Sequence, residues 1–215
     1  MCPQVVRATP DNIHLWGGSL CLDFANTVDW DAEFGYTAPD RTDVLVSGPW
    51  VGRWARRVGI PGRGRISDPE VERLRELRLA VHRLFSLPAP PAGDLEALRG
   101  TVAEGLEAAS MRPSTGSRAM TRAAGGGGAP ATAPSWPGSD ERRVRFAVAW
   151  DALLLLGDAE RLARVRRCPG RDCGWLFVNA SGRRRWCSMS SCGSREKMRR
   201  AYARRRGLGD HQPIA

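Results

Sequence analysis

The stretch CPGRDC (residues 168–173), followed after thirteen residues by CSMSSC (187–192), decides how the C-terminal part of this chain folds. Two close cysteine pairs separated by the length of a short hairpin are the pattern with which proteins surround a tetrahedral metal ion with sulfur. Four thiolates close the coordination sphere of zinc and leave no position for water, so the pattern predicts one structural zinc ion. The predicted ligands are Cys168, Cys173, Cys187 and Cys192.

The residues between the two cysteine pairs predict a β-hairpin. Residues 175–178 alternate as a strand does, which places Trp175 and Phe177 on one face. Asn-Ala-Ser-Gly at 179–182 is a turn signal, and residues 183–186 would form the returning strand. That strand would deliver the second cysteine pair to the metal.

A helix is predicted to follow the hairpin and to donate the last metal ligand. Ser190 or Ser191 can cap this helix, which places Cys192 in its first turn. Met198 and Tyr202 are four residues apart, so they share one face of the helix, and we expect this face to point inward. A knuckle, a hairpin and a helix that donates the last ligand form the treble-clef arrangement.

The charge of the chain indicates an anionic partner. Its net charge is +10 and its pI is about 10.5, which favours nucleic acid first and a membrane surface second. Lys197 is the only lysine, and the arginine fork binds phosphate better than an ammonium group does. A GC-rich genome would also favour arginine over lysine, but it does not account for the clustering of arginines near the C-terminus.

The basic residues of the hairpin and of the last helix are the predicted nucleic-acid contacts. Glu196 is the only acid on that helix, and like charges one turn apart destabilise an isolated helix. A polyphosphate partner would offset this cost; the alternative is a charged face that only meets water. The predicted contacts are Arg183, Arg184, Arg185, Arg195, Lys197, Arg199, Arg200 and Arg204.

Two kinds of nucleic acid fit these residues. Duplex DNA would be held with the helix in the major groove, or with the arginines along the backbone. An RNA- or ribosome-associated protein without sequence-specific DNA recognition is the alternative, because four aromatic side chains could stack on RNA bases if they are exposed. The same side chains would also suit the small core of the zinc module. They are Trp175, Phe177, Trp186 and Tyr202.

The first part of the chain is predicted to be helical, which makes the fold class α+β and mainly helical. Ser67-Asp68-Pro69 is a strong helix start, and the apolar residues that follow, from Val71 to Phe85, hold a period of 3.6. Similar apolar periodicities indicate further helices at about 20–28, 50–58, 94–106 and 144–155.

The composition changes in the middle of the chain. Residues 110–139 consist largely of Ser, Thr, Gly, Ala and Pro, and they cannot bury enough apolar surface to offset the entropy of ordering. We therefore expect a flexible segment there. Order returns near Asp140, and Leu162 and Val165 lead directly into Cys168. This continuity predicts that the zinc module docks on the helical part of the chain.

The sequence also bears on location and catalysis. The N-terminus lacks the apolar core of a signal peptide, and no apolar run approaches the ~20 residues that a membrane helix needs. We therefore expect a cytoplasmic protein with no membrane partner, whose reduced thiols favour metal over disulfides. An enzyme is not expected, because the three histidines are scattered and no nucleophile motif or phosphate-binding loop is present.

Four stretches of the chain resemble a known family. CGWLF (173–177), RRWCSM (184–189) and CGSREK (192–197) resemble the CGNR zinc finger, a module named for a Cys-Gly-Asn-Arg stretch. GGSLCLDFANT (17–27) resembles the opening motif of the ABATE domain, which precedes the finger in this family. The finger departs from the family at Ser194, where the family has an asparagine with a longer reach.

The resemblance implies a bacterial, stress-induced transcription regulator with two parts. An ABATE-like mixed α/β domain at 1–163 would sense a small-molecule effector or form a homodimer, and a treble-clef finger at 164–208 would bind DNA. The candidate lining of an effector pocket is Asp23, Asn26 and Thr27, with local capping and helix packing as the alternative role. Division into two parts also predicts that Cys187→Ser unfolds the finger and abolishes DNA binding but leaves the helical block folded.

Overall fold

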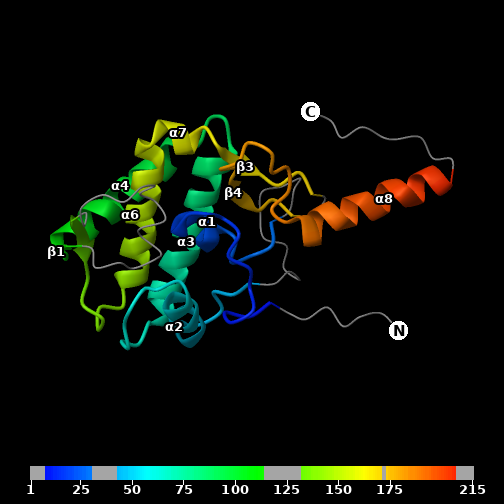
Figure 1. The fold of residues 1–215 in the computed structure, drawn as a ribbon. Helices are drawn as coiled ribbons and strands as arrows, with labels where there is room; N and C mark the ends of the chain where they lie inside the picture. The colour runs from blue at the N-terminus through cyan, green and yellow to red at the C-terminus, as the bar shows by residue number, and fades with distance from the viewer. Residues whose placement is uncertain (1–7, 31–42, 114–131, 171–172, 207–215) are drawn as a thin grey trace.

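The computed structural model describes residues 8–30, 43–113, 132–170 and 173–206 of the 215-residue chain. Helices make up most of the described fold and the strands are short (Figure 1), so the predicted mainly helical α+β class is confirmed. Among the described residues, no helix combines the length and the apolar character needed to cross a membrane. The elements in chain order are α1 (Leu20–Ala25), α2 (Gly48–Arg57), α3 (Asp68–Ser86), α4 (Ala92–Glu107), β1 (Ser110–Pro113), β2 (Thr132–Ser135), α6 (Arg143–Gly157), α7 (Ala159–Leu162), β3 (Val165–Arg167), β4 (Leu176–Val178), η1 (Met189–Gly193) and α8 (Ser194–Arg205).

Helix α3 starts and packs as its sequence predicts. The hydroxyl of Ser67 accepts a hydrogen bond from the backbone N–H of Glu70 (3.4 Å), and Pro69 stands in the first turn. The apolar residues that recur at helical spacing form the buried face of the helix. They are Val71, Leu74, Leu77, Val81 and Leu84.

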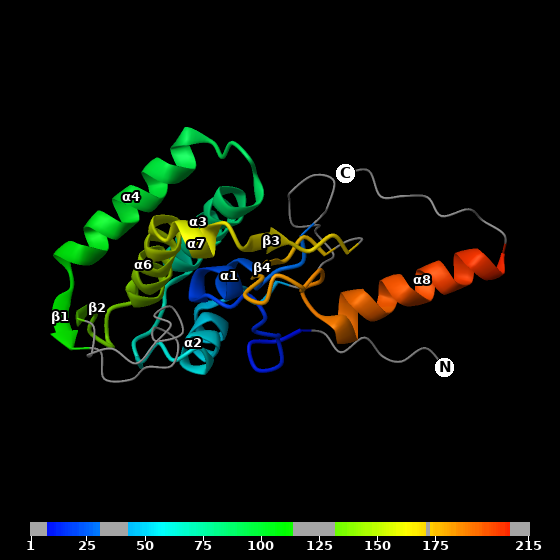
Figure 2. The same ribbon diagram turned by 45° about the horizontal axis from the view of Figure 1, so that its top comes forward.

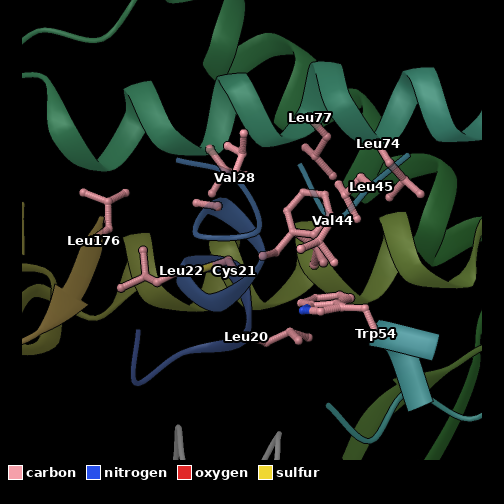
Figure 3. Close-up of a cluster of buried hydrophobic side chains, with 14 of the residues drawn as sticks. Leu20, Cys21, Leu22, Val28, Val44, Leu45, Trp54, Leu74, Leu77 and Leu176 are labelled. Atoms are coloured by element: carbon pink, nitrogen blue, oxygen red, sulfur yellow. The ribbon is translucent and has the colours of Figure 1, made fainter. Parts of the chain in front are cut away.

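The short helix α1 lies inside the core. Figure 3 shows Leu20, Cys21 and Leu22 of this helix in one cluster with Leu74 and Leu77 of α3. Trp54 of α2 and Leu176 of β4 belong to the same cluster. The helix ends at Ala25, three residues earlier than the periodicity of the sequence predicts. Burial on several sides accounts for its apolar sequence.

A carboxylate from another helix holds the start of α1. The hydroxyl of Ser19 and the backbone N–H of Cys21 both donate to Asp151 of α6, over 2.5 and 2.8 Å. Ser19 occupies the N-cap position, but its side chain makes no capping bond of its own. Asp151 therefore supplies the acceptor that a helix N-terminus needs, and it ties α1 to α6.

The segment expected to be flexible begins and ends in paired strands. β1 and β2 are antiparallel, with Ser110 opposite Ser135 and Pro113 opposite Thr132. The indole N–H of Trp136 donates to the carbonyl of Gly105 (2.7 Å) and anchors the strands to α4. The prediction was wrong for these residues because it weighed composition and not backbone pairing; its middle part, 114–131, lies outside the described residues.

One apolar core joins the helical part and the zinc module. Leu176 and Phe177 of β4 are fully buried in the same cluster as Leu22 and Phe24 of α1. The backbone N–H of Val178 donates to the carbonyl of Gly17 (2.8 Å). The predicted docking of the module on the helical part is confirmed.

The strands of the zinc module differ from the predicted hairpin. β4 pairs antiparallel with β3, which precedes the first cysteine, in the register Val165–Val178 to Arg167–Leu176. Residues 183–186, predicted as the returning strand, form no strand. The alternation rule correctly located β4, but local sequence carries little information about which segment pairs with it.

Helix α8 extends away from the rest of the molecule in both overall views (Figures 1 and 2). None of its residues is buried. Met198 is 64% exposed and Tyr202 is 54% exposed, so the expectation that this face points inward is wrong. The core of the module is complete without them, because β4 and the loop after it already pack against the helical part.

Candidate metal centre

The four predicted ligands come together in one buried cluster. One Sγ atom from each of Cys168, Cys173, Cys187 and Cys192 lies within 4.8 Å of the other three, and all four residues are buried. The sulfur of Cys187 lies 3.6 Å from that of Cys173 and 3.5 Å from that of Cys192. Four sulfurs bound to zinc at about 2.3 Å in tetrahedral geometry are about 3.8 Å apart. The spacing therefore fits a single tetrahedral ion.

The backbone of the knuckle is shaped to bring the first two sulfurs together. The N–H of Cys168 donates to the carbonyl of Trp175 (2.7 Å), and the N–H of Cys173 donates to the carbonyl of Gly170 (3.1 Å). A Cβ atom on Gly170 would stand 3.0 Å from the sulfur of Cys192 and 3.4 Å from that of Cys168. Glycine is needed at this position because a side chain would fill the space between the ligands.

The ionisation of the thiols also fits a bound cation. Hydrogen bonds from the neighbouring thiols, first that of Cys173, lower the pKa of Cys168 to about 7. Hydrogen bonds with neighbouring sulfurs, first that of Cys168, raise the pKa of Cys173 well above its usual value. Four crowded thiols cannot all become thiolates without a compensating charge. Zinc supplies this charge and binds each sulfur as a thiolate.

Two of the predicted nucleic-acid contacts lie against the metal cluster. Arg195 donates from Nη2 to the sulfur of Cys192 over 3.0 Å, and this hydrogen bond raises the pKa of Arg195. Arg184 donates to the carbonyls of Trp16, Trp186 and Cys187, and its guanidinium stands 4.4 Å from the centre of the Phe177 ring. The guanidinium of Arg184 is thus occupied by carbonyls of the module and of Trp16, and it holds the loop that carries Cys187.

The buried amide of Asn26 ties the module to α1. Its Nδ2 donates to the carbonyl of Leu176 and its Oδ1 accepts from the N–H of Leu176, both over 2.8 Å. The amide therefore pairs with β4 as a neighbouring strand would, and Asn26 has no exposed surface. The indole N–H of Trp175 adds a bond to the carbonyl of Val28 (3.2 Å).

The buried imidazole of His82 makes a second tie, from α3. Its ring stacks on Trp30, with ring centroids 3.7 Å apart, and Nε2 donates to the carbonyl of Gly174 over 2.9 Å. Burial lowers the pKa of His82 to about 4. Gly174, directly after a metal ligand, has a φ of +63°, and a Cβ atom there would lie 2.7 Å from that of Trp30. The knuckle thus seats closely on the helical part.

The three residues predicted as candidate lining of an effector pocket have structural partners. Asn26 pairs with β4, as described above. Thr27 is fully buried; its hydroxyl donates to the carbonyl of Phe24 (2.7 Å) and accepts from Arg78 (3.1 Å). Asp23 accepts from the backbone N–H of Gly17 (2.7 Å). These contacts match the alternative role in capping and packing.

The remaining predicted contacts lie at the surface. Glu196 is ion-paired with Arg199 (2.7 Å) and Arg200 (2.8 Å) on one side of α8, and its pKa falls to about 2, first through the hydrogen bonds from Arg199. No ion pair involves Lys197 or Arg204 within the part of the chain that the structure describes. The exposed basic residues of the finger from position 183 onward are Arg183, Arg185, Arg195, Lys197, Arg199, Arg204, Arg205 and Arg206.

The aromatic residues considered as stacking partners of RNA differ in exposure. Trp175 and Phe177 belong to the core and cannot reach a base. Trp186 is half-buried. Tyr202 is exposed on α8, where the guanidinium of Arg206 stands 4.8 Å from its ring centre.

The docking residues were missed by the sequence analysis. His82 was counted only among the three scattered histidines, and Trp30 was not singled out. One signal was available: Asn26 follows an apolar run with helical spacing, where a buried amide needs a specific partner. Its partner on β4 is 150 residues away and could not be found from local sequence.

Comparison with known protein families gives two matches. Residues 18–159 match ABATE, described as "Putative stress-induced transcription regulator". Residues 164–205 match the CGNR zinc finger. No curated protein matches the chain. The second match begins just before β3 and ends with α8, so it contains all four clustered cysteines.

Proposed function

We propose, from the premise that this chain belongs to the ABATE family of stress-induced transcription regulators and ends in a CGNR zinc finger, that α8 binds duplex DNA. In this proposal the zinc ion and the helical part hold the base of α8, and the rest of the helix meets the DNA. Zinc would be structural, because four thiolates leave no coordination position for water or substrate. The proposal therefore includes no catalytic step, and it keeps the expected cytoplasmic location.

The observation that carries the proposal is a helix with a strong positive charge and no buried residue. The twelve residues of α8 include Arg195, Lys197, Arg199, Arg200, Arg204 and Arg205, against one acid, Glu196. Their net charge is six minus one, or +5. A helix of this kind gains little from its own protein, so its stability and its charge both favour a polyanionic partner.

The side chains of α8 differ in the DNA contacts that we propose for them. Arg199 and Arg200 share Glu196, which reduces their attraction to phosphate. Lys197, Arg204 and Arg205 keep their full charge for the partner. Met198 and Tyr202 are exposed on the same helix face, where apolar groups can contact thymine methyl groups in a major groove.

The loop before Cys187 would add a second line of contacts to the same DNA. Arg183 and Arg185 are exposed there, whereas Arg184 is occupied by the carbonyl groups of Trp16, Trp186 and Cys187. We therefore assign Arg183 and Arg185 to phosphates, and Arg184 to the scaffold of the finger. Arg195 has a shared role, because it is exposed but also donates to the thiolate of Cys192.

A salt titration of DNA binding tests the proposal. The affinity of the zinc-loaded protein for duplex DNA should fall with salt by about 0.9 log–log unit for each phosphate contacted. Arg204→Ala/Arg205→Ala should reduce this slope by about two units. The matched control is Arg99→Ala/Arg112→Ala, which removes the same charge from exposed positions outside the finger and should keep the wild-type slope. Equal slopes for both variants would contradict the role of α8.

RNA binding stays the second candidate, supported by exposed Tyr202 with Arg206 beside its ring. A single exposed aromatic residue of the four considered is a weak platform for successive bases. Single-stranded RNA should therefore bind less tightly than duplex DNA of the same length. The opposite order, together with a loss of RNA affinity in Tyr202→Ala, would favour RNA.

The proposed role of the N-terminal domain is to position the finger and to respond to an effector or a second copy of the chain. Its support is the shared core, through which a change at α1 or α3 would reach β4. Sedimentation of the zinc-loaded protein checks the dimer, and a concentration-independent monomer would exclude it.

A further inference from the structure

A second group of arginines lies outside the finger. Between Val44 and Ser67 the chain contains five arginines and no acidic residue. All five are exposed, and the other exposed residues between positions 51 and 66 are Gly59 and Pro61. Three of them belong to α2 and two to the loop after it, which Figure 1 shows beside the other helices. They are Arg53, Arg56, Arg57, Arg63 and Arg65.

Two of these arginines are engaged by the N-terminal segment. Arg53 forms an ion pair with Asp11, and Arg57 donates to the carbonyl of Pro10 over 3.1 Å. Within the described residues, no ion pair involves Arg56, Arg63 or Arg65. We call these three residues the Arg56 surface. Their charge is available to a partner.

A buried arginine contacts the loop that carries Arg63 and Arg65 of the Arg56 surface. Arg143, the first residue of α6, is 2% exposed, and its guanidinium donates to the carbonyls of Pro61 (3.1 Å) and Asp140 (2.9 Å). It forms no ion pair with a carboxylate of the described residues. Gly62 allows this close approach, because a Cβ atom there would overlap with Nε of Arg143.

The acids nearest this place are already engaged by other groups. Burial lowers the pKa of Arg143, and the nearby charge of Arg56 lowers it further. The carboxylate of Asp140 has the opposite effect and raises this pKa. The Asp140 carboxylate is itself paired with Arg142 (3.0 Å), and that of Glu141 accepts from the backbone N–H of Ser67 (2.9 Å). A buried cation without a carboxylate partner is costly, and an anion bound above it would offset part of this cost.

We propose that the Arg56 surface binds phosphates of the DNA backbone as a second contact site of this protein. Arginine forks match phosphate oxygens two at a time. A membrane is less well matched, because the exposed residues between positions 51 and 66 are the five arginines, Gly59 and Pro61, and include no large apolar side chain that could insert. α2 lies apart from α8 in both overall views (Figures 1 and 2), so the two surfaces would contact different phosphates. This inference rests on the proposed function, since it extends the DNA contact beyond the finger.

The test compares salt titrations with a long duplex for zinc-loaded proteins. Arg56→Ala/Arg63→Ala should reduce the log–log slope by about two units, while a control with Arg99→Ala/Arg112→Ala keeps the wild-type slope. A duplex too short to extend beyond the finger should give equal slopes for wild type and the Arg56→Ala/Arg63→Ala variant. Arg204→Ala/Arg205→Ala should lower the slope on both duplexes. Unchanged unfolding temperatures show that the variants are folded.

The outcomes separate this inference from the proposed function. An unchanged slope for Arg56→Ala/Arg63→Ala, beside a reduced slope for Arg204→Ala/Arg205→Ala, overturns only the second site. A wild-type protein that binds no duplex overturns both. A further outcome is that inorganic phosphate or pyrophosphate stabilises the wild type but not Arg56→Ala/Arg63→Ala, while the DNA slope of this variant stays unchanged. This result would show that the Arg56 surface binds a free phosphate ligand and not the DNA backbone. Binding to anionic lipid vesicles that requires Arg56 and Arg63, with an unchanged DNA slope, would show that the Arg56 surface binds a membrane and not DNA.

Discussion

The two ends of the zinc finger are built in opposite ways. At its base, the cysteines and β4 are buried, and hydrogen bonds from Asn26 and His82 join them to α1 and α3. At the other end, α8 has no buried residue and extends from the molecule (Figure 2). Since burial gives most of the stability of a fold, the base carries the stability of the finger. The exposed helix contributes charge, and its side chains remain available to a partner.

This contrast changes the expected consequence of losing zinc. The sequence suggested that the finger would unfold and leave the helical block intact. The structure places Leu176, Phe177 and Trp175 in the same core as α1. A finger that unfolds would therefore expose one side of the helical part as well. We expect the two regions to lose stability together.

Removal of the metal should have the largest effect. Zinc contributes about 10–16 kcal/mol to the folding of zinc-finger peptides, which is comparable with the whole stability of a domain. Chelation or Cys187→Ser should therefore unfold the finger and lower the unfolding temperature of the helical part. Tryptophan fluorescence and far-UV circular dichroism during heating measure both. The control Cys21→Ala alters a buried thiol outside the cluster and should keep the zinc. An unchanged unfolding transition of the helical part after chelation would contradict the expectation that the two regions lose stability together.

Asn26→Ala should have the next largest effect. The substitution leaves the N–H and the carbonyl of Leu176 buried without their partner, and each unsatisfied group costs about 1–3 kcal/mol. We expect a loss of about 2–4 kcal/mol in the free energy of unfolding, measured by denaturant titration with zinc present. Thr101→Ala serves as the control, because Thr101 is a half-buried residue of α4 whose hydroxyl donates to the carbonyl of Ala97 in its own helix. Equal small losses for both would show that the amide does not join the two regions.

Acid should weaken the base of the finger through His82. Burial lowers its pKa to about 4 in the folded protein, against about 6.5 in an unfolded chain. The unfolded state binds the proton more tightly, so stability is complete above pH of about 6.5 and falls as the pH drops toward 4, by up to about 3 kcal/mol. Denaturant titrations at several pH values measure this slope. His82→Gln should be less stable at neutral pH and should show a flatter slope; a slope identical to wild type would contradict the assignment.

Changes on α8 should have the smallest effect on stability. Met198→Ala/Tyr202→Ala removes two exposed side chains, and exposed substitutions of this kind change stability by about 0.5 kcal/mol or less. The unfolding temperature and the zinc content should stay as in wild type, while the affinity for duplex DNA falls. A large loss of stability would mean that α8 packs on the molecule, and the contrast between the two ends would no longer hold.

The parts of this structure that follow from local sequence were predicted, and those that depend on distant partners were not. The spacing of Cys168, Cys173, Cys187 and Cys192 was sufficient to predict the metal cluster. Ser67 and the apolar period after it predicted α3. The partner of β4 was wrong, because antiparallel pairing with residues before Cys168 leaves no local signal. The same limit applies to buried residues that bond across the chain.

The inward face predicted for α8 shows a different limit. Met198 and Tyr202 have the spacing of a buried stripe, and helical periodicity alone does not say whether a surface exists for the stripe to cover. The helical part already supplies that surface to β4. Arg184 was predicted to bind nucleic acid from its charge, yet carbonyl groups surround its guanidinium. Residue type predicts what a side chain can bind, but its direction comes from the fold.

Hydrogen exchange of the zinc-loaded protein, with and without duplex DNA, shows whether α8 is the surface that meets DNA. We predict that DNA slows exchange of the backbone amides of α8, which has no buried residue, and leaves the already protected amides of β4 nearly unchanged. Exchange that is slowed only in the N-terminal helices, or not at all while DNA is bound, would contradict the claim that α8 is the surface that meets DNA.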